Sequence, residues 1–242
     1  MAKAFADIKE SFIFNFIEGA RWKYITNGLL VTLKVTFFAL LIGLAIGVVV
    51  AMIRSSYDQT KDEMQPGLGR TLMTGLNTLA RLYLTVIRGT PVVVQLLIGY
   101  FVIFVSTTDT VFVASMVFGI NSGAYITEII RGGIMSIDHG QFEAGRSIGF
   151  TYIQTMRHII IPQAFKNVLP SLANEFIALL KETAVCGYIG LMDLTKGGDV
   201  IRGRTFSAFM PLIAVALIYL ILVVFFSWLI GKLERRLRSS ER

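Results

Sequence analysis

The stretch GLLVTLKVTFFALLIGLAIGVVVAMI, residues 28–53, holds a single charged residue, Lys34. An α-helix rises about 1.5 Å per residue, so a hydrocarbon core about 30 Å thick is crossed by roughly 20 apolar residues. A run of this length and composition predicts a membrane-spanning helix. The strict alternation of apolar and polar residues that is typical of a membrane barrel strand is absent from it.

Four further apolar runs follow the first, at about residues 84–105, 110–130, 169–188 and 209–230. The whole chain is 54% hydrophobic and only 16% charged, whereas soluble domains carry about 25% charged residues. The sequence therefore predicts an all-α membrane protein with about five transmembrane helices.

The distribution of Lys and Arg predicts how the chain crosses the membrane. The segments 54–70, 131–168 and 232–242 would share one side and carry more Lys and Arg than the other side. Positive loops stay cytoplasmic, so we expect a multi-pass protein of the cell (inner or plasma) membrane with its N-terminus outside and its C-terminus in the cytoplasm. Anionic lipid headgroups explain the net charge of +7 better than nucleic acid, because no compact basic face is visible.

Three regions are expected. Residues 1–26 lack the apolar core of a secretory signal, and the helical spacing of Ile8, Phe12, Ile13 and Phe16 predicts an extracytoplasmic amphipathic segment. A loosely ordered tail is an open alternative for this segment. Residues 27–232 form the transmembrane domain, and residues 233–242 form a basic cytoplasmic tail.

The sequence shows no pattern that is typical of a metal site or of a nucleotide-binding loop. Cys186 is the only cysteine, and the only histidines, His139 and His158, are far apart, so a metal site is not expected. No G-x-x-x-x-G-K-[ST] phosphate loop is present. We expect neither an enzyme nor a cofactor of its own.

The segment EAGRSIGFTYIQTMRHIIIP, residues 143–162, lies in the longest loop predicted to be cytoplasmic. Its residues predict a short helix at 142–147, a turn at Gly149, and a second helix that ends or kinks near Pro162. Ala144 and Gly145 would leave a small, smooth surface for close approach by another protein.

The spacing in this segment resembles the E-A-A-x3-G-x9-I-x-L-P loop of ATP-binding-cassette importer permeases. Glu143, Ala144, Gly149, Ile159 and Pro162 match in register, while Gly145 and Ile161 replace Ala and Leu. Three further stretches resemble the polar amino acid (histidine, arginine, glutamine) branch of that family: R-G-T-P-x-x-x-Q at 88–95, S-x-A-Y-x-x-E-x-x-R at 122–131 and N-E-x-x-x-x-L-K-x-T at 174–183.

The resemblance implies a type I importer transmembrane architecture and an alternating-access path for a polar amino acid, with basic amino acids among the candidates. It also implies two ATPase subunits that bind the ATP, a second permease chain, identical or related, and an extracytoplasmic solute-binding protein. The coupling loop at about 138–162 would dock on the ATPase through Glu143, Ala144, Gly145, Gly149 and Pro162.

Polar residues inside the predicted spans are candidates for the solute path, because they are costly to bury in lipid. The candidates are Asn121, Ser122, Tyr125, Glu128 and Glu175. Glu175 could instead brace the helices by pairing with Lys181 or Arg88, and both readings stay open at this point. A self-sufficient secondary carrier or channel is the rival hypothesis, although we find no inverted repeat.

Overall fold

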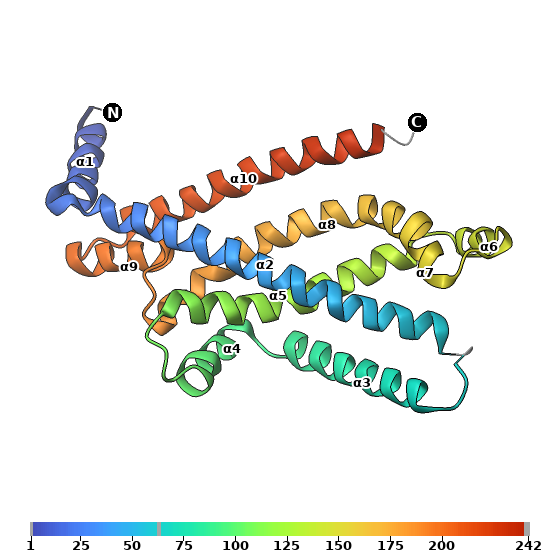
Figure 1. Cartoon of the computed structure of the whole chain (residues 1–242). Coiled ribbons are helices and arrows are strands. Elements are labelled where there is room, and N and C mark those ends of the chain that lie inside the picture. Colours follow the sequence, from blue (N-terminus) through green and yellow to red (C-terminus); the bar gives the residue numbers. More distant parts are fainter. Residues whose placement is uncertain (1, 62–63, 240–242) are drawn as a thin grey trace. The chain divides into compact units, whose positions relative to one another are not determined.

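The computed structural model describes residues 2–61 and 64–239, and no strand occurs among them. The long helices are α2 (Trp22–Thr60), α3 (Leu68–Gly89), α5 (Thr110–Met135), α8 (Ile161–Glu182) and α10 (Phe209–Ser239). Shorter helices are α1 (Ala2–Phe12), α4 (Val92–Ile98), α6 (His139–Ser147), α7 (Tyr152–Thr155) and α9 (Leu194–Thr205). Five π or 3-10 turns join them: η1 (Ile13–Ile17), η2 (Glu18–Ala20), η3 (Gly99–Ile103), η4 (Met156–Ile160) and η5 (Thr183–Ile189) (Figure 1).

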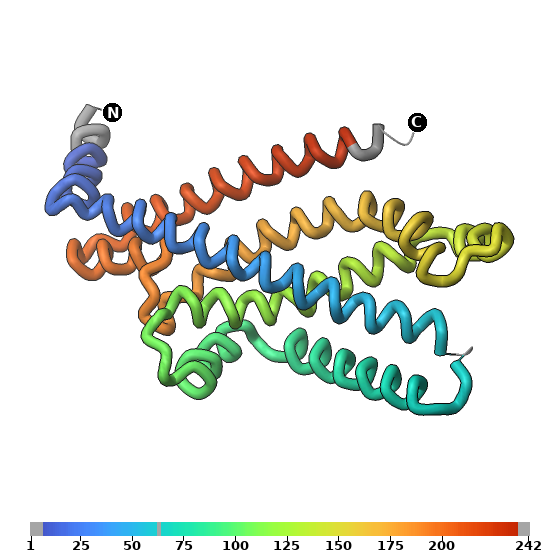
Figure 2. The backbone as a smooth tube through the Cα atoms, in the orientation of Figure 1, coloured from blue at the N-terminus to red at the C-terminus, as the bar shows by residue number. Residues whose placement is uncertain are grey.

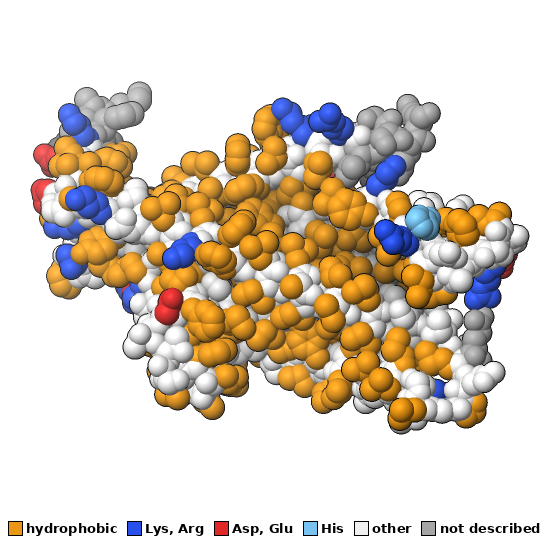
Figure 3. Space-filling view, viewed as in Figure 1, with side chains coloured by type: hydrophobic (Ala, Val, Ile, Leu, Met, Phe, Trp, Pro, Cys, Tyr) orange, Lys and Arg blue, Asp and Glu red, His pale blue; other side chains and the backbone are white. Residues whose placement is uncertain are grey.

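The prediction of an all-α membrane protein is confirmed. Within the described residues, α2, α5 and α10 are long and apolar enough to cross a membrane, and α3 with α4 and η3 would make a fourth, broken span. Helix α8 is also long enough, but it is less apolar than α2, α5 and α10, because it carries Lys166, Glu175, Lys181 and Glu182. Hydrophobic side chains dominate the visible surface along the long helices, as lipid contact requires (Figure 3).

The second apolar run differs from the prediction of one span at residues 84–105. Helix α3 ends at Gly89, Thr90 is extended (φ −123°, ψ 145°), and α4 begins at Val92. Pro91 explains the break, because proline disfavours a helical conformation in the residue before it and donates no backbone hydrogen bond. The trace in Figure 2 shows this interruption in an otherwise helical stretch.

The chain forms two compact units that both draw on distant parts of the sequence. Unit 1 comprises residues 1–39, 92–118 and 177–228, and unit 2 comprises residues 40–91, 119–176 and 229–242. In unit 1, Phe16 packs with Ile25, Leu194 and Ile201, and Thr205 donates a 2.9 Å hydrogen bond to Asn15. The described residues before α2 are therefore helical and pack within unit 1.

Unit 2 is held together by close contact between α2 and α5. A Cβ atom on Gly47 would lie 2.4 Å from Cγ2 of Ile126, and one on Gly43 would lie 3.2 Å from the backbone nitrogen of Gly123. Small residues let helices approach closely where lipid provides no hydrophobic drive for association. The G-x-x-x-G pair of α2 is thus a packing surface.

Replacing Gly47 by Val should destabilise the chain, because the added atoms overlap Ile126. Overpacking of this kind costs about 1–3 kcal/mol, and thermal unfolding in mild detergent would measure it. Gly75→Val is the matched control, since a Cβ on Gly75 meets nothing within 4 Å. Equal melting temperatures for the two variants would contradict this packing account.

Candidate solute path and coupling site

The loop between α5 and α8 is built from local capping interactions. The Asp138 carboxylate accepts a 2.6 Å hydrogen bond from the Gly140 amide at the start of α6. Thr151 and Gln154 form a reciprocal capping box at the start of α7. Between the two helices, Gly149 has φ +84°, in the left-handed region that glycine adopts without strain. The predicted helix and turn are present, although α6 begins at His139 rather than at residue 142, and a second helix follows the turn from Tyr152.

Two details of the coupling loop differ from the sequence interpretation. Gly145 is buried, and a Cβ there would lie 2.6 Å from Thr155, so its small size serves packing of α6 on α7 rather than an open surface. Pro162 does not end a helix either, because α8 continues past it to Glu182. The π-turn η4 ends at Ile160, two residues before Pro162, and the wider turn accommodates a residue that cannot donate a backbone hydrogen bond.

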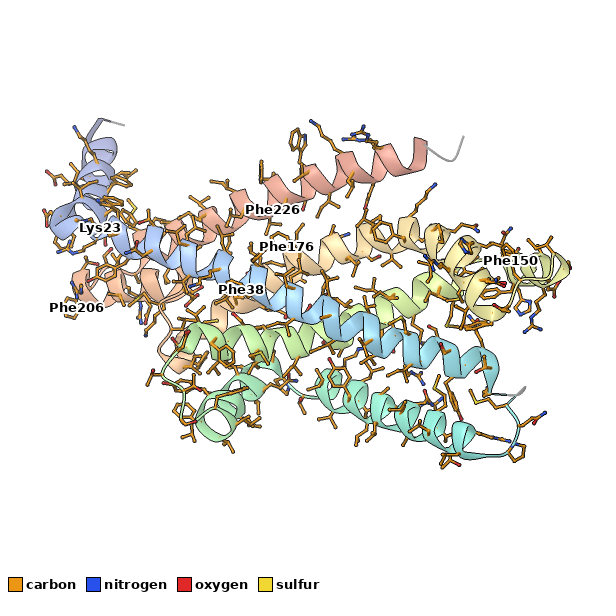
Figure 4. All side chains as sticks on the ribbon, in the orientation of Figure 1. Lys23, Phe38, Phe150, Phe176, Phe206 and Phe226 are labelled. Carbon is orange, nitrogen blue, oxygen red and sulfur yellow. The ribbon has the colours of Figure 1, made fainter. Side chains whose placement is uncertain are left out.

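The outer surface of the loop exposes two large apolar side chains. Ile148 is 66% exposed and Ile153 is 74% exposed, and Ala144 and Glu143 are exposed beside them on α6. Phe150 lies between α6 and α7, at the end of unit 2 where the loop turns (Figure 4). Large apolar side chains at a loop that is predicted to lie outside the membrane indicate a protein contact.

A cavity of about 680 Å³ lies beside this loop, between α6, α7 and the ends of α2 and α5. Its charged lining residues are Asp58, Arg131, Glu143 and Arg146, and His139 also lines it. Burial raises the pKa of the Tyr152 phenol in its wall, so this side chain remains a neutral hydroxyl at physiological pH.

Within unit 2, Ser122 on the candidate span α5 and Glu175 on α8 are in direct contact. The Ser122 hydroxyl donates a 2.8 Å hydrogen bond to Oε1 of Glu175. Ser122 is fully buried and the neighbouring Asn121 is 3% exposed. Two of the predicted path residues, 53 positions apart in sequence, therefore meet across two helices.

Tyr125 and Glu128 lie farther along α5 and have other partners. The Arg88 guanidinium stacks over the Tyr125 ring at 5.5 Å. Glu128 pairs with Arg131 at 3.3 Å, and Arg131 also reaches Asp58 of α2 at 3.5 Å. Arg88 therefore contacts the ring of Tyr125, and Glu128 is part of a network that ties α5 to α2.

Sequence reasoning missed a second cavity, of about 570 Å³, between α2, α3 and α5. Arg54, Arg81 and Arg88 line it together with Tyr125 and Glu128. A signal for it was present, because polar residues recur every three or four positions along α3, at 71, 74, 78, 81, 85 and 88. In the sequence, Arg88 stands out only as part of a motif and as a possible partner of Glu175, and Arg81 has no assigned role.

Comparison with known proteins places the chain in a family. Residues 67–239 match the family described as binding-protein-dependent transport system inner membrane component. The chain belongs to this family. GlnP of Rickettsia bellii, a protein named for glutamine transport, is 37% identical over 90% of this chain and 94% of its own length. The arginine transport system permease protein ArtQ of Bacillus subtilis is 35% identical, with the same coverage of both chains.

A solved structure agrees with these sequence matches. The crystal structure of an amino acid ABC transporter with histidines contains a chain with a TM-score of 0.79 and 38% identity, covering 91% of this chain and 98% of that one. As a member of this family, the chain is a multi-pass transport component of the inner membrane. The type I importer fold that the sequence predicted is confirmed.

In this permease fold, the Ser122–Glu175 contact should be measurable as an energetic coupling. Ser122→Ala and Glu175→Gln, alone and combined, form a double-mutant cycle in thermal unfolding, and we expect a coupling of about 1–3 kcal/mol, as for hydrogen bonds to a carboxylate. Ser115→Ala is the control, because the Ser115 hydroxyl on α5 donates its hydrogen bond to the backbone oxygen of Val111 in the same helix. Additive effects of Ser122→Ala and Glu175→Gln would show that the bond contributes nothing.

Proposed function

We propose that this chain is the permease subunit of an ATP-driven importer for a polar amino acid. The observation that carries the proposal is the capped, exposed loop of α6 and α7, which connects the two helices that hold Ser122 and Glu175. A push on that loop would act on the site through α5 and α8. Relatives named for glutamine and arginine transport support an amino acid as the solute.

Several partners belong to this proposal. Two ATPase subunits would dock on the 138–162 loop and bind the ATP. A second permease chain, identical or related, would complete the path, and an extracytoplasmic solute-binding protein would deliver the amino acid. Closure of the ATPases would move the loop and open the path alternately to each side, by rigid-body motion of packed helices.

The surface of α6 and α7 fits a docking role for specific residues. Glu143 and Ala144 lie on the exposed side of α6, while Gly145 holds the helix against α7 from the other side. Gly149 sets the angle between the two helices. The docked surface in this proposal comprises Glu143, Ala144, Ile148 and Ile153, with Gly145, Gly149 and Pro162 shaping the loop beneath it.

The solute is proposed to be glutamine or a basic amino acid. The carboxylate of Glu175, held by Ser122 inside the membrane-spanning part, would attract an ammonium or guanidinium group. Orientation follows the positive-inside rule, which puts the loop and the C-terminus in the cytoplasm and the N-terminus outside.

Ala144→Trp tests the docking surface, because the larger side chain would project from the exposed side of α6. We expect loss of ATPase co-purification in mild detergent and at least a tenfold loss of ATP-driven uptake in proteoliposomes, since a bulky side chain in a closely packed contact overfills it. The uptake assay would use labelled glutamine and arginine with the cognate binding protein.

Gly132→Trp is the matched control, because Gly132 is exposed on α5 and a Cβ there meets nothing within 4 Å. This variant should keep the ATPase and transport normally. Uptake by the purified chain alone, without ATP or an ATPase, would contradict the proposal and support a self-sufficient carrier.

A further inference from the structure

Helix α3 presents three different faces along its length. Asn77, Ala80 and Leu84 pack into unit 2. A second face exposes apolar side chains suited to lipid, among them Leu72, Leu79 and Val86. The third face is polar and exposed, and consists of Thr71, Thr74, Thr78, Arg81, Thr85 and Arg88. Guanidinium groups on such a face cannot lie against hydrocarbon, so this face borders water or a polar ligand.

The arginines of this face converge with Arg54 of α2 on the 570 Å³ cavity. Arg54 is only 8% exposed, and its Nη1 donates a 2.8 Å hydrogen bond to Oδ1 of Asn77. Its Nε is buried and has no hydrogen-bond partner within the described residues. A buried guanidinium N–H without an acceptor carries an uncompensated desolvation free energy, which a bound hydrogen-bond acceptor would offset.

The charges around the cavity do not balance. Arg54, Arg81 and Arg88 face a single carboxylate, Glu128, which is already paired with Arg131 at 3.3 Å. Neither Arg81 nor Arg88 forms an ion pair with a side chain in the part of the chain that the structure describes. Charges inside a membrane protein need partners, so the cavity calls for an anion.

We propose that the cavity lined by Arg54, Arg81 and Arg88 binds the carboxylate of the amino acid in transit. This inference rests on the proposed function and adds the ligand group that is recognised and the residues that hold it. A guanidinium presents parallel N–H donors that match the two oxygens of a carboxylate. Arg88 is held by its stacking on Tyr125, which lines the same cavity.

In this proposal the arginine cavity and the Ser122–Glu175 pair bind different parts of the solute. All α-amino acids share the carboxylate, so the arginine cavity reads the part of the solute that does not vary. Three guanidinium groups would repel a cationic side chain, so such a side chain would be accommodated away from them. Ser122 lies on α5, as Tyr125 does, and it holds Glu175 of α8, whose carboxylate the rest of the solute can meet.

Equilibrium binding of labelled L-glutamine and L-arginine to the permease–ATPase complex, without the binding protein, tests the inference. The complex would be held in nanodiscs of phosphatidylcholine. We expect Arg81→Gln and Arg88→Gln each to raise the Kd at least tenfold, as loss of a charge-assisted hydrogen bond predicts. Arg81→Lys should recover part of the affinity, and wild type should bind glutaminamide and argininamide, which lack the carboxylate, at least tenfold more weakly.

Arg70→Gln is the matched control, because Arg70 is exposed in the first turn of α3 and lies outside the cavity lining. Its Kd should stay within about twofold of wild type, as surface substitutions usually do. Equal binding of the amides by wild type, or unchanged Kd values for Arg81→Gln and Arg88→Gln, would overturn the inference. An effect of these variants only in nanodiscs with phosphatidylglycerol would identify lipid phosphate as the anion instead and would also overturn it.

Uptake by the reconstituted wild-type system separates this inference from the proposed function. ATP-driven uptake by wild type, together with unchanged binding by the arginine variants, would leave the proposed function standing and remove the carboxylate site. If wild type imports no amino acid in the presence of its ATPase and binding protein, both the proposed function and the carboxylate site are contradicted.

Discussion

Hydrocarbon cannot solvate a charge, and this constraint organises unit 2. Each ionisable side chain among its membrane-spanning helices must find a partner within the protein or border a polar space. Glu175 is held by Ser122, Glu128 by Arg131, and Arg54 by Asn77. Two of these contacts also join helices. The Glu175–Ser122 bond links α8 to α5, and the Arg54–Asn77 bond links α2 to α3. The polar groups that we propose for the transport path are thereby also groups that fix the bundle.

The site and the coupling loop are parts of one continuous stretch of chain. Helix α5 carries Ser122 and Tyr125 and ends at Met135, a few residues before α6 begins at His139. From Tyr152 the chain is helical through η4 into α8, which carries Glu175. A displacement of the loop would therefore reach both sides of the Ser122–Glu175 contact through rigid helices. Packing of Gly145 on Thr155 and of Gly133 on Val168 keeps the two arms of this stretch together.

Much of this architecture was predictable from sequence because it depends on local features. These are the length of an apolar run and the position of Gly149 between two helical segments. The run at residues 28–53 and the helix–turn–helix at 142–155 follow from such local rules, and both are present. The break at Thr90–Pro91 was missed, although Pro91 signalled it, because apolar length alone suggested a span. The environment of Gly145 and the convergence of Arg54 with Arg81 depend on which helices are neighbours, and a single sequence does not reveal that.

The account depends on the α6–α7 loop lying in the cytoplasm, opposite the turn between α9 and α10. Single cysteines at these places report their side directly, because the native Cys186 is fully buried and should not react. Ile148 is 66% exposed and Phe206 is 95% exposed, so Ile148→Cys and Phe206→Cys should be accessible to a membrane-impermeant maleimide. In sealed right-side-out vesicles we predict labelling of Phe206→Cys, and labelling of Ile148→Cys only after permeabilisation. Labelling of Ile148→Cys in the sealed vesicles would contradict the account.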